Sequence, residues 1–138
     1  MAIYVFEVGE YVKVGFTARD NIWKRINEIC YGPKPIGKDL KGTEPEDCTP
    51  LLWIPAGTIE EEQHFHSLFK RNVKMGREWY PESMAGTILY ILTSCFGLNG
   101  CMVDYEIESW IDYCVRMERE RFAKEVESNY ADIPEALQ

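Results

Sequence analysis

The sequence predicts a mixed α/β fold of the α+β class, in which helices flank a small three-stranded antiparallel sheet. Two short β-branched and aromatic runs, joined by a Gly-Glu turn, lie within residues 1–16. A third apolar run, bounded by prolines, lies at residues 51–55. Between and after these runs, apolar residues recur at helical spacing, which indicates amphipathic helices packed against the sheet.

The first two strands are predicted to form a tight hairpin. Both runs are rich in Val, Tyr and Phe, which suit a pleated sheet. Gly9-Glu10 fits a type II′ turn, because glycine supplies the positive φ of the first central position. This turn sets a register in which Tyr4 lies opposite Gly15 and on the same face as Lys13. We therefore expect a phenol, an ammonium group and a bare backbone patch on one side of the hairpin.

A short helix, a long loop and the third strand follow. The helix is predicted over residues 21–30 with Asp20 as its N-cap. Three isoleucines at i, i+4 and i+7 form its apolar face, and Arg25 lies on the flank of that face. Residues 31–50 are rich in glycine, proline and charge, which predicts a loop. The continuous apolar run 51–55 is typical of a central strand.

The second helix has the clearest start in the chain. Thr58 and Glu61 form a capping box, and the helix is predicted to run to about Arg71. A basic turn follows, and Pro81 is predicted to occupy N1 of a third helix that ends near residue 96. The stripe of the second helix that is expected to face the sheet consists of Ile59, Glu62, His66 and Phe69.

The acidity of the chain belongs to its last segment. The net charge is −8, but residues 1–50 and 51–100 each carry only −1, whereas residues 101–138 carry −6 from ten acids and four bases. The near-neutral first part can therefore hold a local basic cleft. A long helix is predicted from Asp104, and the apolar face of residues 104–126 is expected to pack on the preceding domain, on a protein partner or on a second copy.

The composition indicates whether the chain is a disulfide-stabilised, secreted or membrane protein. A chain of 138 residues with 46% hydrophobic residues can bury a core without disulfide or metal support. Five scattered cysteines without a C-x-x-C pair predict reduced thiols. Since the chain has no long apolar run and no basic-then-apolar leader, we expect a cytoplasmic protein with no membrane partner.

Glu62 is the first candidate for chemistry. A carboxylate on the apolar stripe of a helix is costly to bury unless it is paired or binds a metal. His66 lies one turn further along the same face, where the two side chains can interact. The alternative is that the helix is rotated so that Glu62 lies at the solvent edge and His66 is a packed histidine. Periodicity alone leaves both interpretations open.

The order of several motifs resembles the GIY-YIG nuclease superfamily. Ile3-Tyr4-Val5 precedes a hairpin that leads to Lys13-Val14-Gly15-Phe16-Thr17, and Arg25 follows in a short helix. The chain is most similar to the phage and fungal branch, in which lysine replaces the second tyrosine of the motif. That branch also has Glu-x-x-x-His-x-x-Phe in a later helix, then a basic turn and Glu-Trp-aromatic, which here are residues 62–69 and Glu78-Trp79-Tyr80.

This resemblance, which covers residues 2–80, implies a metal-dependent endonuclease that hydrolyses DNA phosphodiester bonds. It implies that Glu62 holds one Mg²⁺ or Mn²⁺ ion, which prefers oxygen ligands. It implies that Tyr4 orients or deprotonates the attacking water and that Arg25 clamps the phosphate. Lys13 would bind phosphate or lower the pKa of Tyr4, and His66 would assist proton transfer or orient Glu62.

The resemblance also predicts how the chain is organised. Residues 1–100 would form a GIY-YIG-like nuclease domain of phage or mobile-element character, and residues 101–138 an acidic helical extension. DNA would be the partner, because cations near the site can contact its phosphates. The cations expected to do so are Arg19, Lys24, Arg71, Lys74 and Arg77.

Two further hypotheses remain open from the sequence. The chain could be a catalytically silent protein that kept the nuclease fold and uses its acidic surface to bind a basic partner. Alternatively, the acidic helix could lie over the basic turn at residues 71–77 and restrain the nuclease.

Overall fold

The structure, a computed structural model, describes residues 1–31, 44–70, 72 and 78–131. The chain divides into two compact units, residues 1–107 and 108–138. The first unit contains an antiparallel sheet with helices, so the predicted α+β class is confirmed. No helix in the described part of the chain is both long enough and apolar enough to cross a membrane.

The sheet has five antiparallel strands rather than the three predicted, in the order β4-β2-β1-β3-β5. The two additional strands are the edges, and they are only three and two residues long, too short to show the alternation that predicts a strand. Their addition leaves the first strand, rather than the third, at the centre of the sheet. The strands are β1 (Ala2–Val8), β2 (Tyr11–Thr17), β3 (Thr49–Ile54), β4 (Trp79–Pro81) and β5 (Met102–Val103).

The predicted hairpin and its register are confirmed. In the pairing of β1 with β2, Tyr4 lies opposite Gly15 and Val8 opposite Tyr11. Gly9 has a φ of 57°, the positive value that a type II′ turn requires at its first central position. Among the described residues, no residue other than glycine has a positive φ. The turn chemistry therefore determines which side chains of the hairpin share a face.

The first helix starts one residue later than predicted. Helix α1 covers Ile22–Tyr31. The side chain that caps it is Asn21, whose Oδ1 accepts the Trp23 N–H at 2.7 Å. Asp20, the predicted N-cap, instead forms an ion pair with Lys24 at 2.9 Å. Because both adjacent residues have side chains that can cap a helix, the local pattern could not decide between them.

Helix α2 covers Ile59–Leu68, and its predicted capping box is present. Thr58 Oγ1 accepts the Glu61 N–H at 3.2 Å, and a Glu61 carboxylate oxygen accepts the Thr58 N–H at 3.0 Å. The face that packs on the sheet is rotated from the predicted stripe. Ile59 is 43% exposed, whereas Glu62 and Phe65 are buried. The predicted stripe was therefore wrong at its first residue, although it was right about the carboxylate.

The third predicted helix was wrong at its start. Pro81 ends strand β4, and helix α3 covers Ala85–Phe96 after a 3₁₀ turn at Glu82–Met84. Proline suits both an edge strand and a helix N1 position, so its presence did not decide between them. At the other end, α3 stops at Phe96, as predicted, and a 3₁₀ turn over Leu98–Gly100 follows it.

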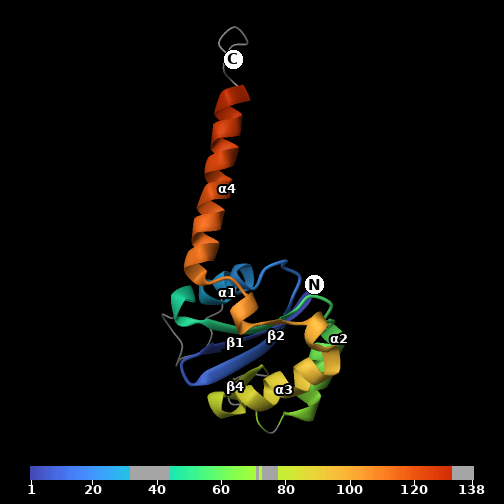
Figure 1. Cartoon of the computed structure of the whole chain (residues 1–138). Coiled ribbons are helices and arrows are strands. Elements are labelled where there is room, and N and C mark those ends of the chain that lie inside the picture. The colour runs from blue at the N-terminus through green and yellow to red at the C-terminus, as the bar shows by residue number, and fades with distance from the viewer. Residues whose placement is uncertain (32–43, 71, 73–77, 132–138) are drawn as a thin grey trace. The chain divides into compact units, whose positions relative to one another are not determined.

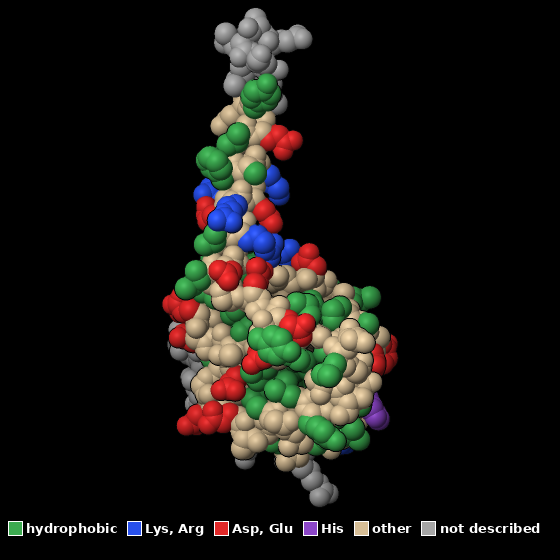
Figure 2. All heavy atoms as spheres, viewed as in Figure 1, with side chains coloured by type: hydrophobic (Ala, Val, Ile, Leu, Met, Phe, Trp, Pro, Cys, Tyr) green, Lys and Arg blue, Asp and Glu red, His purple; other side chains and the backbone are tan. Residues whose placement is uncertain are grey.

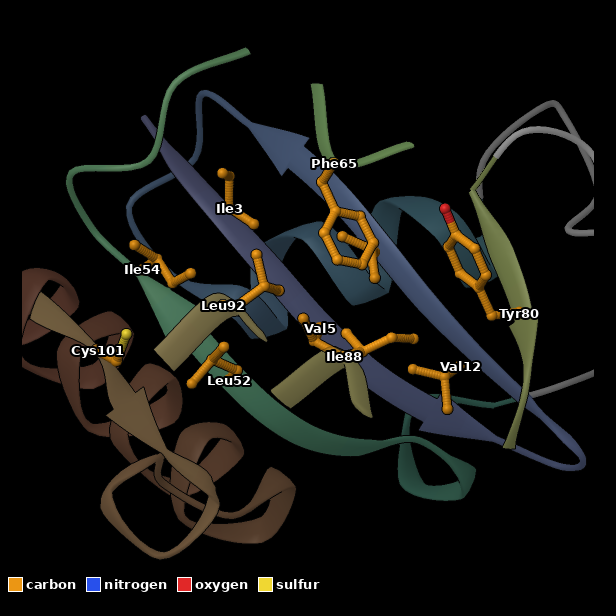
Figure 3. Packing of buried hydrophobic residues seen from close by; sticks show 11 residues of the cluster. Ile3, Val5, Val12, Leu52, Ile54, Phe65, Tyr80, Ile88, Leu92 and Cys101 are labelled. Atoms are coloured by element: carbon orange, nitrogen blue, oxygen red, sulfur yellow. The ribbon is translucent and has the colours of Figure 1, made fainter. Parts of the chain in front are cut away.

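The two faces of the sheet bury different sets of side chains. Ile3 and Val5 point into a core cluster that also contains Ile88 and Leu92 of α3 (Figure 3). Because side chains alternate along a strand, Tyr4 points to the opposite face. There it meets helix α1 through Arg25, whose Nε donates a hydrogen bond to the Tyr4 hydroxyl. The side chains of Tyr4 and Arg25 thus lie on the face of the sheet opposite this core cluster.

The second unit consists of helix α4 (Trp110–Ala131), which begins six residues after the predicted start (Figure 1). Residues 104–106 form a separate 3₁₀ turn in the first unit. Figure 2 shows basic and acidic side chains interleaved along α4, together with hydrophobic ones. Several of the apolar residues predicted to pack are exposed, including Ile111, Val115, Phe122 and Val126.

Candidate functional site

Tyr4 lies directly over the backbone of Gly15. A Cβ at Gly15 would sit 2.3 Å from the Tyr4 hydroxyl oxygen, a distance that no side chain tolerates. The glycine is therefore required by the close approach of the phenol ring, as the hairpin register predicted. The Tyr4 hydroxyl accepts a hydrogen bond from Arg25 Nε at 3.2 Å, which connects the hairpin to helix α1.

Lys13 is buried beside the same hairpin. Its ammonium group forms an ion pair with the carboxylate of Glu78, the residue that precedes strand β4. The side chain of Lys13 is 8% exposed, whereas that of Glu78 is 37% exposed. The ammonium group also lies 5.0 Å from the ring centroid of Trp79, within the range of a cation–π contact. Trp79 is buried against Phe6, so it packs on the sheet.

Glu62 and His66 come together on α2. Glu62 Oε1 lies 2.8 Å from His66 Nε2, and the two side chains are 6% and 13% exposed. His66 Nε2 also lies 3.0 Å from the carbonyl oxygen of Val14, and Nδ1 lies 2.6 Å from the Tyr80 hydroxyl. Of the two alternatives that the sequence left open, the structure has the buried pair rather than a solvent-edge carboxylate.

These groups converge at the edge of strand β2. Strand β4 pairs with β2 only at positions 11–13, so the β2 backbone beyond Lys13 has no strand beside it on that side within the described residues. Val14 uses this edge instead: its N–H donates to the carbonyl oxygen of Glu78 at 3.0 Å, and its carbonyl accepts from His66. One ligand atom from each of Glu62, His66 and Glu78 lies within 4.8 Å of the others.

Burial controls the ionisation of the candidate residues. Burial raises the pKa of Tyr4 well above its usual value, although the Arg25 guanidinium opposes the shift. The Tyr4 phenol is therefore protonated near neutral pH, because burial outweighs the effect of the neighbouring cation. Burial also lowers the pKa of Lys13, while the Glu78 carboxylate opposes that shift. For Tyr80, burial first and the charges of Glu62 and Glu78 second raise the pKa to about 12.

The donor atoms present suit a divalent cation. The Glu62 and Glu78 carboxylates lie close together in a partly buried position, and a divalent ion would offset the mutual repulsion that remains beside the Lys13 ammonium group. Carboxylate oxygens are the ligands that Mg²⁺ and Mn²⁺ prefer. Glu62, the predicted metal ligand, and Glu78 are therefore the residues that could hold such an ion, and His66 lies beside them.

The predicted DNA-binding cations have different outcomes. Arg19 pairs with Glu28 at 2.9 Å, and Lys24 pairs with Asp20 at 2.9 Å, so each is partly neutralised on the surface near α1. Arg71, Lys74 and Arg77 lie outside the described residues. The basic turn to which they belong is therefore still a prediction.

Sequence reasoning assigned no role to two residues that the structure brings into the site. Glu78 contacts Lys13, and Tyr80 contacts His66. Both belong to the Glu-Trp-aromatic motif that contributed to the resemblance. The signal was therefore present, but a motif that lies twelve residues or more beyond His66 does not indicate by itself which of its side chains return to the site.

Comparison with known proteins assigns neither a family nor a function to this chain. No protein-family model, no curated protein and no solved structure matches this chain. The function is therefore inferred from the geometry of the site and from the motif resemblance.

Proposed function

We propose that this chain is a divalent-metal-dependent endonuclease of the GIY-YIG type, which hydrolyses DNA phosphodiester bonds. The observation that carries the proposal is the connection between the four motif residues at one sheet edge. Tyr4 accepts a hydrogen bond from Arg25, Lys13 pairs with Glu78, and one ligand atom of Glu62 lies within 4.8 Å of one of Glu78. These contacts link titratable residues from separate segments of the chain, which supports a functional site.

Each residue has a role that follows from its surroundings. Tyr4 keeps its proton, so it orients the attacking water rather than deprotonating it. Arg25 uses Nε on Tyr4 and carries two further guanidinium nitrogens, which suit the oxygens of a phosphate. Lys13 supplies a buried positive charge beside them. His66 holds the Glu62 carboxylate in place. The chemistry supplied by a bound divalent ion is stabilisation of negative charge on the scissile phosphate and leaving oxygen.

The decisive experiment is cleavage of supercoiled plasmid DNA with Mg²⁺ or Mn²⁺. We expect nicked or linear product that disappears on chelation and falls at least about a hundredfold in Glu62→Gln. Glu60→Gln is the matched control, because Glu60 lies on the same helix but is exposed. Cleavage by Glu62→Gln at the rate of the unchanged protein would exclude this assignment of the site.

A second candidate is a silent protein of the same fold that binds a cationic protein. It is favoured by the −6 net charge of residues 101–138. On α4, Arg116 and Arg121 each pair with two glutamates, which leaves the acids in excess. This candidate predicts no cleavage at any Mg²⁺ or Mn²⁺ concentration, together with salt-sensitive binding to a basic protein.

A further inference from the structure

We propose that Glu78 is a second carboxylate ligand of the divalent metal, and that His66 positions Glu62 without binding the metal itself. This inference rests on the proposed function, because the ion concerned is the one that function requires. It gives a role to Glu78, to which neither the helical pattern nor the hairpin register assigned a function.

Glu62 and Glu78 face one common space from α2 and from the start of β4. Ligand atoms of Glu62, His66 and Glu78 lie within 4.8 Å of one another. The Lys13 ammonium group pairs with Glu78, and a divalent ion held by both carboxylates would offset the repulsion that remains between them. The pair is therefore a natural site for a divalent ion.

The surroundings of His66 determine which of its nitrogens carries a proton. The acceptor oxygens of Val14 and Glu62 lie 3.0 Å and 2.8 Å from Nε2. A lone pair on Nε2 would face these oxygens unfavourably, so we assign an N–H to this nitrogen. Nδ1 then accepts the proton of the Tyr80 hydroxyl at 2.6 Å. Because both of its nitrogens make hydrogen bonds, His66 orients the Glu62 carboxylate and has no nitrogen left to bind the metal. Metal-binding carboxylates commonly have such hydrogen-bond partners.

Glu78 is already held in position by its own backbone and by Lys13. Its carbonyl oxygen accepts the Val14 N–H at 3.0 Å, and the carbonyl of the same Val14 lies against His66. The backbone N–H and carbonyl of Val14 therefore hold the segment of Glu78 and helix α2, which carries Glu62, close to each other. Lys13 binds one oxygen of the Glu78 carboxylate, and a carboxylate has a second oxygen for a cation. The 37% exposure of this side chain gives an ion access from solvent.

The two possible ligand sets favour different metals. A site formed by Glu62 and Glu78 offers only oxygen ligands from side chains and favours hard ions such as Mg²⁺ and Mn²⁺. A site that included a His66 nitrogen would instead favour Zn²⁺ and similar ions. The two arrangements are therefore distinguishable by spectroscopy as well as by mutation.

The test is a Mn²⁺ titration of the full chain without DNA, monitored by the electron paramagnetic resonance signal of free Mn²⁺. Glu78→Gln removes the charge, and Glu78→Asp keeps the charge but withdraws the carboxylate by one methylene. We expect each to weaken Mn²⁺ binding about tenfold or more. Glu60→Gln should bind as the unchanged protein does. Thermal unfolding by circular dichroism checks that each variant is folded.

The outcomes separate the two proposals. Unchanged affinity in Glu78→Gln, or in Glu78→Asp alone, contradicts direct ligation by Glu78 while leaving the proposed function intact. Electron spin echo modulation from a directly bound imidazole nitrogen contradicts the role given to His66. If the unchanged protein binds no Mn²⁺, both the inference and the proposed metal-dependent function are wrong.

Discussion

Helices α2 and α4 each carry a pair of polar residues at i, i+4 spacing, but the pair on α2 is buried and the pair on α4 is exposed. On α2, Glu62 and His66 lie 2.8 Å apart with side chains that are 6% and 13% exposed. On α4, Arg121 and Glu125 lie 3.0 Å apart with side chains that are 64% and 57% exposed. Spacing and distance are nearly equal, so burial is the difference. Solvent screens the pair on α4, whereas the pair on α2 lies where an unpaired charge is costly.

The largest expected effect comes from breaking the buried pair. His66→Ala removes the partner of Glu62 and the hydrogen-bond partner of Tyr80, so it should lower the free energy of unfolding by about 3 kcal/mol. Glu125→Ala on α4 should lower it by less than about 0.5 kcal/mol. Urea unfolding of both variants and the unchanged protein measures these values. Equal losses in the two variants would mean that burial does not separate the pairs.

A second contrast concerns two glycines. Gly15→Ala places a Cβ against the Tyr4 ring and should destabilise the protein by about 1–3 kcal/mol, with loss of activity. Gly86 lies within α3, and no atom lies within 4 Å of the position that a Cβ would occupy there, so Gly86→Ala should stabilise by about 0.5–1 kcal/mol. The measurement is again urea unfolding. A neutral Gly15→Ala would show that the phenol is not held closely over the backbone.

The pH dependence of stability tests the burial of the Tyr80 hydroxyl beside Glu62 and Glu78. The pKa of Tyr80 is raised from 10.0 to about 12 in the folded state. Between these values the unfolded chain releases the proton and the folded chain keeps it, so stability should fall as pH rises from 10 toward 12. Tyr80→Phe should flatten this decline without abolishing it, because burial also raises the pKa of Tyr4. An unchanged slope in Tyr80→Phe would contradict the assignment.

The smallest expected effect is the coupling within the exposed pair. A double-mutant cycle on Arg121 and Glu125 should give about 0.3–0.5 kcal/mol, and salt at about 1 M should remove most of it. The same cycle on Glu62 and His66 should give about 1–3 kcal/mol and change little with salt. A strongly salt-dependent coupling on α2 would indicate that this pair is open to solvent.

Much of the local structure was predictable because its causes are local. The Gly9 turn determines the hairpin register, which places Tyr4 over Gly15. The capping box at Thr58 determines where α2 begins, and its spacing brings His66 one turn after Glu62. These features depend on backbone dihedral angles and hydrogen bonds within a few residues, so the sequence alone carries the information.

Other features depend on contacts between segments that are distant in sequence, so they could not be predicted from local patterns. The edge strands β4 and β5 exist because β2 and β3 offer unpaired backbone groups beside them. The rotation of α2, which buries Glu62 and exposes Ile59, follows from packing on the sheet. Glu78 reaches Lys13, 65 residues away, because β4 pairs with β2. The sequence by itself determined the hairpin and the spacing of the carboxylate and histidine. The sheet edge that joins them to Glu78 was decided by long-range strand pairing, which no local pattern encodes.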